Sequence, residues 1–64
     1  MSTDMLKYLS QKVNDELARM ESDMALGGAK DFSDYKYACG IIRGLRVANN
    51  ILMETAERME EADD

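Results

Sequence analysis

The chain has 64 residues, a formal net charge of −5, a single cysteine and no histidine or proline. A chain of this length forms one domain at most, and its core rarely supplies more than about 3–5 kcal/mol of stability. One cysteine excludes an internal disulfide, and the lack of histidine excludes a Cys/His zinc site. The remaining way to stabilise the chain is a partner, and a second copy is the simplest partner.

The lone cysteine and the lack of a signal-peptide pattern are typical of a protein in a reducing cytosol. No apolar run approaches the roughly 18 residues that a membrane-spanning helix needs. We therefore expect no membrane partner.

The net charge is concentrated at one end of the sequence. Residues 1–53 contain seven acidic and seven basic side chains, whereas residues 54–64, "ETAERMEEADD", contain six acidic side chains and one arginine. Proteins that bind nucleic acid neutralise its phosphates with a net basic face, which is not visible here. Nucleic acid is therefore not an expected partner. The acidic end is interpreted as a solvated last helical turn, with mimicry of nucleic acid in a basic cleft as the alternative.

A first helix is predicted at about residues 3–26. Its apolar residues recur at steps of three and four, which is typical of a helix with one buried stripe; they are Leu6, Leu9, Val13, Leu17, Met20 and Met24. A strict seven-residue pattern from Leu9 breaks at Glu16 and Asp23. This break favours ordinary helix packing over a long coiled coil.

The segment "LGGAKDFSD", residues 26–34, predicts a turn at about residues 27–31. Gly27 suits the left-handed conformation that ends many helices, and Gly28 is expected to loosen the chain after it. Asp31 or Ser33 can then cap the next helix.

A second helix is predicted at about residues 32–61, and it has two apolar faces. The first face comprises Tyr35, Ala38, Ile42, Leu45, Leu52, Ala56 and Met59. The second, rotated from the first, comprises Tyr37, Ile41, Gly44, Ala48 and Ile51. The first helix can cover only one of them. The sequence therefore predicts a single-domain, all-α protein spanning residues 1–64. It is an antiparallel two-helix hairpin that assembles into a helical bundle by homo-oligomerisation.

Gly40, Gly44 and Ala48 lie four residues apart in this second helix, where each glycine costs about 1 kcal/mol relative to alanine. Three interpretations stay open: the glycines admit bulky side chains of the first helix, allow close contact with a second chain, or bend the helix. The polar run of Arg43, Arg46, Asn49 and Asn50 is either a solvated edge or a contact line to a partner. The predicted interface comprises Tyr37, Gly40, Ile41, Arg43, Gly44, Arg46, Ala48 and Ile51.

No residue pattern indicates catalysis, so we expect no enzyme, no cofactor and no metal. Cys39 has no histidine to act as its base, and we expect a small buried helix residue at this position. Asp31 and Asp34 lack the spacing of a calcium loop, and helix capping accounts for both.

The segment "DFSDYKYACGIIRGLRVANNILMETAERM" resembles small acidic helical proteins encoded among the morphogenesis genes of tailed bacteriophages, which generally lack an assigned activity. The matching positions are Asp31, Phe32, Tyr35, Gly40, Ile42, Gly44, Leu45, Ala48 and Ile51. The resemblance covers about half of the chain and implies a phage protein with no catalytic residue.

The residues and the resemblance together lead to one preferred function. We expect a non-enzymatic structural or assembly protein in the virion or the host cytoplasm, with further partners such as portal or capsid. The alternative is a small acidic regulatory binder that inhibits a host enzyme such as RNA polymerase, a nuclease or a defence complex.

Overall fold

The computed structural model describes residues 2–62, which form two α-helices and no β-strand. Helix α1 spans Ser2–Ala25 and helix α2 spans Phe32–Ala62. Asp63 and Asp64 of the acidic end lie outside the described residues. The predicted all-helical class is confirmed, and each helix begins and ends within one residue of the expected position.

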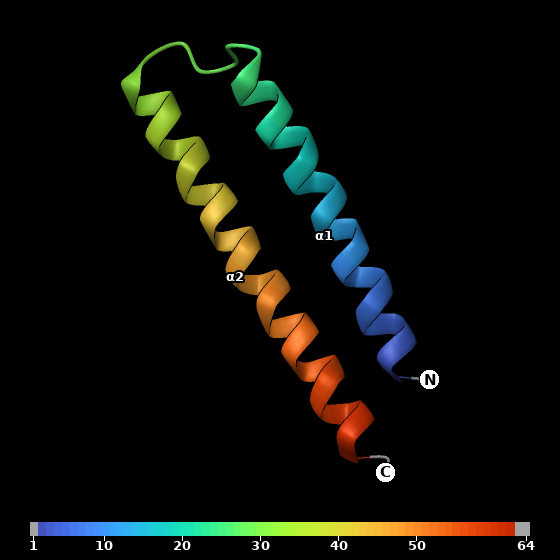
Figure 1. Cartoon of the computed structure of the whole chain (residues 1–64). Helices are drawn as coiled ribbons and strands as arrows, with labels where there is room; N and C mark the ends of the chain where they lie inside the picture. Colours follow the sequence, from blue (N-terminus) through green and yellow to red (C-terminus); the bar gives the residue numbers. More distant parts are fainter. Residues whose placement is uncertain (1, 63–64) are drawn as a thin grey trace.

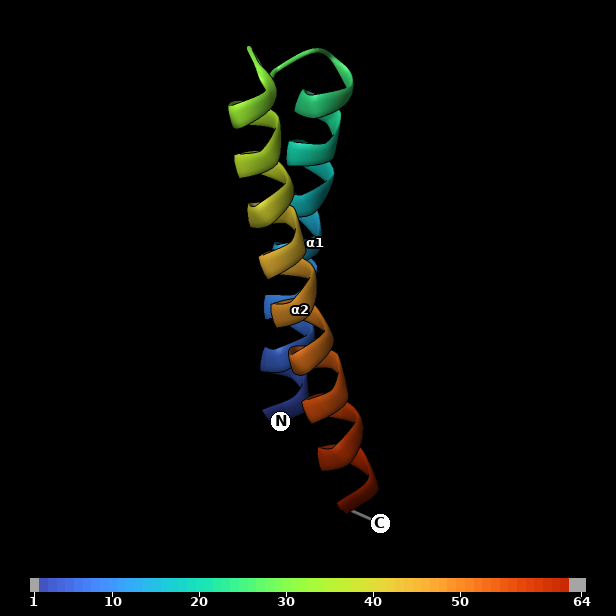
Figure 2. The same ribbon diagram turned by 90° about the vertical axis from the view of Figure 1, so that its left-hand side faces the viewer.

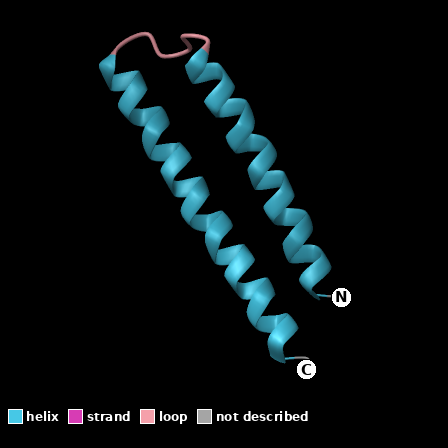
Figure 3. Cartoon of the chain, viewed as in Figure 1, coloured by secondary structure: helices cyan, strands magenta, loops and turns pink. Residues whose placement is uncertain are grey.

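The two helices form a hairpin. A short loop joins them at one end, and both termini lie at the other (Figures 1 and 3). The ion pair between Lys7 and Glu60, at 2.7 Å, joins the helices near the open end, and Arg46 and Glu21 pair closer to the loop. Figures 1 and 2, seen from directions 90° apart, both show that α2 extends beyond the first turn of α1. The molecule is a rod of 50 × 15 × 12 Å.

The end of α1 is set by two glycines. Gly27 has a φ of 85°, the left-handed conformation expected for it. Its N–H donates to the carbonyl of Met24 at 3.1 Å, and the N–H of Gly28 donates to that of Asp23 at 2.8 Å. This pair of bonds is the Schellman motif. A Cβ on Gly28 would lie 2.8 Å from the Asp23 carbonyl oxygen, so Gly28 permits a close approach rather than loosening the chain.

The start of α2 is capped by a carboxylate. The backbone N–H of Asp34 donates to the side chain of Asp31 at 2.8 Å, which satisfies a first-turn amide that has no partner within the helix. In return, the N–H of Lys30 donates to the Asp34 carboxylate at 3.3 Å. Of the two predicted caps, Asp31 performs the role. Both aspartates are therefore occupied in local capping.

The seam between the helices follows an unbroken seven-residue repeat. Its buried and half-buried positions alternate at steps of three and four; they are Leu6, Ser10, Val13, Leu17, Met20 and Met24 on α1, and Ala38, Ile42, Leu45, Asn49, Leu52, Ala56 and Met59 on α2. The expected stripe was wrong at one position, because Leu9 is exposed while Ser10 is only 4% exposed. The repeat therefore runs through Ser10, Leu17 and Met24 and does not break at Glu16 and Asp23.

Replacement of Gly27 by alanine tests the left-handed end of α1. We expect Gly27→Ala to lower the free energy of unfolding by about 1–2 kcal/mol, because a Cβ disfavours this conformation. Urea unfolding followed by circular dichroism measures the change. Ala25→Gly is a useful comparison, since it places a glycine inside the last turn and costs about 1 kcal/mol for a different reason. Unchanged stability of Gly27→Ala would show that the turn adopts another conformation in solution.

Candidate protein-interaction surface

One side of α2 carries apolar residues that α1 does not cover. We call this the outer face of α2 and define it as Tyr37, Gly40, Gly44, Val47, Ala48 and Ile51. The side chains of Tyr37, Val47 and Ile51 are 73%, 51% and 57% exposed. The predicted division of α2 into a covered and an uncovered face is thus observed, with two exceptions. Tyr35 of the first face is exposed and stacks on Phe32, and Ile41 of the second is half-buried.

Val47 was not among the predicted interface residues. It lies within the polar run from Arg43 to Asn50, for which a solvated edge and a contact line to a partner were both open. Its spacing of four from Ile51 was the signal that could have found it, since residues four apart share a helix face. Val47 therefore extends the outer face beyond the predicted stripe.

Gly40 and Gly44 lie in open space. A Cβ added at either glycine would meet no atom within 4 Å. The interpretation that they admit side chains of α1 is therefore wrong, because α1 does not pack against them. With Ala48 they form the shallow part of the outer face.

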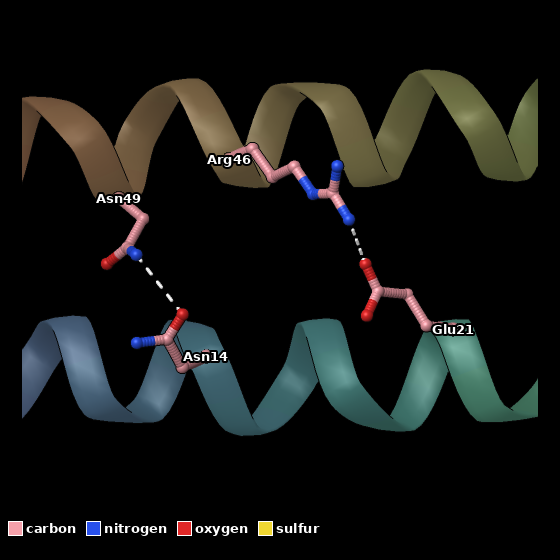
Figure 4. Close-up of polar contacts among 4 residues, drawn as sticks. All are labelled: Asn14, Glu21, Arg46 and Asn49. Carbon is pink, nitrogen blue, oxygen red and sulfur yellow. Dashed lines mark hydrogen bonds and ion pairs between the residues drawn. The ribbon is translucent and has the colours of Figure 1, made fainter.

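The polar run of α2 divides between the two sides of the helix. Arg46 pairs with Glu21 of α1, and the Nδ2 of Asn49 donates to the Oδ1 of Asn14 at 3.2 Å (Figure 4). Arg43 and Asn50 are exposed. Arg46 and Asn49 thus bind within their own hairpin, which leaves Arg43 as the arginine beside the outer face.

A polar cluster lies inside the seam. The hydroxyl of Ser10 donates to the Oδ1 of Asn49, and Asn49 in turn donates to Asn14, so the three side chains link the helices midway along the hairpin. A hydrogen-bonded polar pair at a core position of a helix seam fixes the register of the helices at some cost in stability. The sequence-based prediction placed Asn49 at a solvated edge or at a partner, and its true contact depended on the unexpected inward position of Ser10.

Two titrating groups are perturbed by neighbours. The hydrogen bond and the charge of Glu60 raise the pKa of Lys7 above its ordinary value. The neighbouring side chain of Cys39 raises the pKa of Tyr35 above its ordinary value. Cys39 is exposed, contrary to the expectation that it is buried, because the inward position of this turn is taken by Ala38.

At the loop end, the hairpin has an open depression of about 420 Å³ whose lining includes Met24, Leu26 and Tyr37. Tyr37 also belongs to the outer face, so the uncovered apolar surface continues from α2 towards the loop. Among the described residues, no cluster of three or more cysteine, aspartate or glutamate side chains is arranged to hold a metal ion.

No protein-family model, curated protein or solved structure matches this chain. Within residues 2–62, neither helix is long and apolar enough to cross a membrane.

The polar cluster in the seam can be tested by removing one partner or both. We expect Ser10→Ala to lower the free energy of unfolding by about 1–3 kcal/mol, because it removes the donor to the half-buried Asn49. The double variant Ser10→Ala with Asn49→Leu should recover most of this loss, since position 49 then has no polar group that lacks a partner in the seam. Urea unfolding of the two variants and the parent measures both effects. A double variant as unstable as the single one would show that the loss does not come from an unpaired Asn49, and would contradict the proposed role of the hydrogen bond.

Proposed function

We propose that this chain is a non-enzymatic protein that acts through helix–helix contacts, and that antiparallel hairpins associate through the outer face of α2 into a helical bundle. The observation that carries the proposal is the exposure of Tyr37, Val47 and Ile51 on one side of α2. Water-exposed apolar side chains that adjoin one another on a small domain typically mark an interaction site.

The small core of the hairpin supports this proposal. Among residues 3–62, whose side chains the structure describes, the buried apolar residues are Leu17 and Ala56, and none of the large side chains is completely buried. Each fully buried Leu or Ile side chain contributes about 1.5–3 kcal/mol, so a seam of half-buried residues gives little stability. Association with another helical surface would complete the core.

The exposed area supports it as well. The chain exposes 5116 Å², whereas a compact monomer of 7.2 kDa exposes about 4100 Å². The excess of about 1000 Å² is similar to the roughly 800 Å² that each partner contributes to a stable protein interface. A dimer or larger bundle would therefore return the molecule to ordinary compactness.

The two glycines of the outer face are consistent with a partner. They lower helix stability by about 1 kcal/mol each, and nothing within the hairpin requires them. A groove of small residues allows two helix backbones to approach closely and gain dispersion contacts. Such contacts would compensate for the loss of helix propensity.

The resemblance to small acidic phage proteins directs the proposal to a biological setting. We place the chain in the virion or in head–tail assembly of a tailed bacteriophage, where portal or capsid proteins would be its further partners. An elongated hairpin with an uncovered apolar outer face suits an assembly role, because it offers a contact surface along much of α2.

The self-association can be tested with a matched pair of charge substitutions on α2. We expect the parent protein to sediment as a dimer or larger bundle at micromolar concentration and Ile51→Glu to sediment as a monomer, because a buried carboxylate opposes association. Met53→Glu adds the same charge two positions away, at an exposed residue on the other side of α2 from the outer face, and should leave association unchanged. Analytical ultracentrifugation measures all three proteins. A folded parent protein that stays monomeric at high micromolar concentration would contradict the self-association.

The virion role predicts that the chain is a component of phage particles. Mass spectrometry of purified procapsids and mature capsids, from the phage that encodes the chain, should detect it in at least one of the two. Its absence from both particles, despite expression during infection, would contradict this role.

A second candidate function rests on the acidic end of α2. The last turns of α2 lie at the open end of the hairpin and extend beyond α1. Their exposed acidic residues are Glu54, Glu57, Glu60 and Glu61. This end is suited to a basic cleft of a host enzyme such as RNA polymerase, a nuclease or a defence complex. Affinity capture during infection separates the two functions: portal, scaffold or capsid protein favours assembly, and a stoichiometric host enzyme favours inhibition.

A further inference from the structure

Four exposed charges lie in one line along α2, beside the outer face. Seven residues separate Lys36 from Arg43 and Glu54 from Glu61, and eleven separate Arg43 from Glu54. Because a helix has about 3.6 residues per turn, these spacings are close to two and three full turns. All four side chains therefore share one side of α2.

The line is basic in its first half and acidic in its second half. It borders the outer face, since Lys36 lies one turn from Gly40 and Arg43 lies one turn from Val47. The ion pairs among residues 3–62 are Lys7–Glu60, Arg19–Glu16 and Arg46–Glu21, so none of the four charges takes part in an ion pair inside the hairpin. The ammonium of Lys36 lies over the ring of Phe32, 5.7 Å from its centroid, on the exposed surface of α2. The charged line is therefore available to a partner.

From this pattern we infer that the partner on the outer face is a second copy of this chain, related by a two-fold axis that passes near Ala48, with the two α2 helices running in opposite directions. The inference rests on the self-association proposed above and adds its geometry. In this arrangement Arg43 of each copy lies beside Glu54 of the other, and Lys36 lies beside Glu61. A two-fold interface makes every such contact twice.

The same axis also brings the apolar residues of the outer face into register. It places Ile51 opposite Gly44 of the other copy, so the larger side chain enters the space left by the glycine. Ile41 is then opposite Thr55, and Ala48 is opposite its own copy. The charged line and the small residues thus independently place the two-fold axis at the same point of α2, to within one residue.

A parallel arrangement of the two α2 helices fails on the same charges. A two-fold axis parallel to the helices would place the charged lines of the two copies on opposite edges of the interface, so Arg43 and Lys36 would lie far from Glu54 and Glu61 of the other copy. The parallel arrangement therefore forms none of these ion pairs, whereas the antiparallel arrangement forms each of them twice, and charges at the edges of an interface commonly set the orientation of paired helices.

Single cysteines distinguish these arrangements. The native Cys39 is first replaced by serine, and Ala48→Cys, Ile41→Cys and Thr55→Cys are then made separately in that background. Under mild oxidation we expect Ala48→Cys to form an intermolecular disulfide with itself, because the axis brings the two copies of this position within disulfide distance. Ile41→Cys and Thr55→Cys should each stay uncrosslinked alone and should form a heterodimer when mixed.

The other possible results distinguish a wrong dimer geometry from a failure of self-association. Self-crosslinking of both Ile41→Cys and Thr55→Cys would show a parallel dimer and overturn the inference, while the proposed self-association would stand. A dimer by ultracentrifugation in which Ala48→Cys does not crosslink would likewise overturn the geometry alone. A monomeric Cys39→Ser parent at high micromolar concentration would overturn both.

Charge reversal gives a second test that does not depend on cysteine. We expect Arg43→Glu to weaken dimerisation by about tenfold or more, because it places two carboxylates together at two symmetric positions. Adding Glu54→Arg to it should restore dimerisation. The matched control combines Arg43→Glu with Asp15→Arg, which has the same net charge but reverses an exposed residue of α1. Equal recovery in the control would show that net charge, and not this pairing, governs association, which would overturn the inference.

Discussion

The structure depends on the fact that two helices have only one seam between them. Each helix can bury one stripe of side chains against its neighbour, and here that stripe consists of small and half-buried residues around Leu17 and Ala56. Because the chain contains no third helix among its described residues, the remaining apolar side chains of α2 have nothing to cover them. The thin core, the large exposed area and the outer face all follow from this single constraint.

The polar cluster of Ser10, Asn14 and Asn49 fixes how the seam is aligned. A purely apolar seam could slide or rotate at little cost, whereas a hydrogen bond across half-buried positions is satisfied in only one register. The ion pairs of Lys7 with Glu60 and of Arg46 with Glu21 lie on exposed edges and add little to stability. The cluster thereby also sets the rotation of α2, and with it the residues that face outward.

The outer face combines features that have no use in an isolated hairpin. Gly40 and Gly44 weaken α2 without contacting α1, and the charged line from Lys36 to Glu61 makes no ion pair within the hairpin. The glycines and the charged line would both contribute to binding if a second α2 lay against the first. The small residues then permit close approach, and the division of charge favours opposite helix directions.

The sequence by itself determined the two helices, the glycine turn, a cap on α2 at Asp31 or Ser33, and the presence of two apolar faces on α2. These features follow from local propensity and helical periodicity, which depend on neighbours within a few residues of each other. Only the tertiary structure decided which positions face the seam. Leu9 was expected inside, because apolarity is the only burial signal in one sequence. Instead Ser10 lies inside, where its hydroxyl donates a hydrogen bond to Asn49, 39 residues away. The same long-range contact shows that Asn49 faces α1, and the space around Gly40 and Gly44 shows that α1 does not use them.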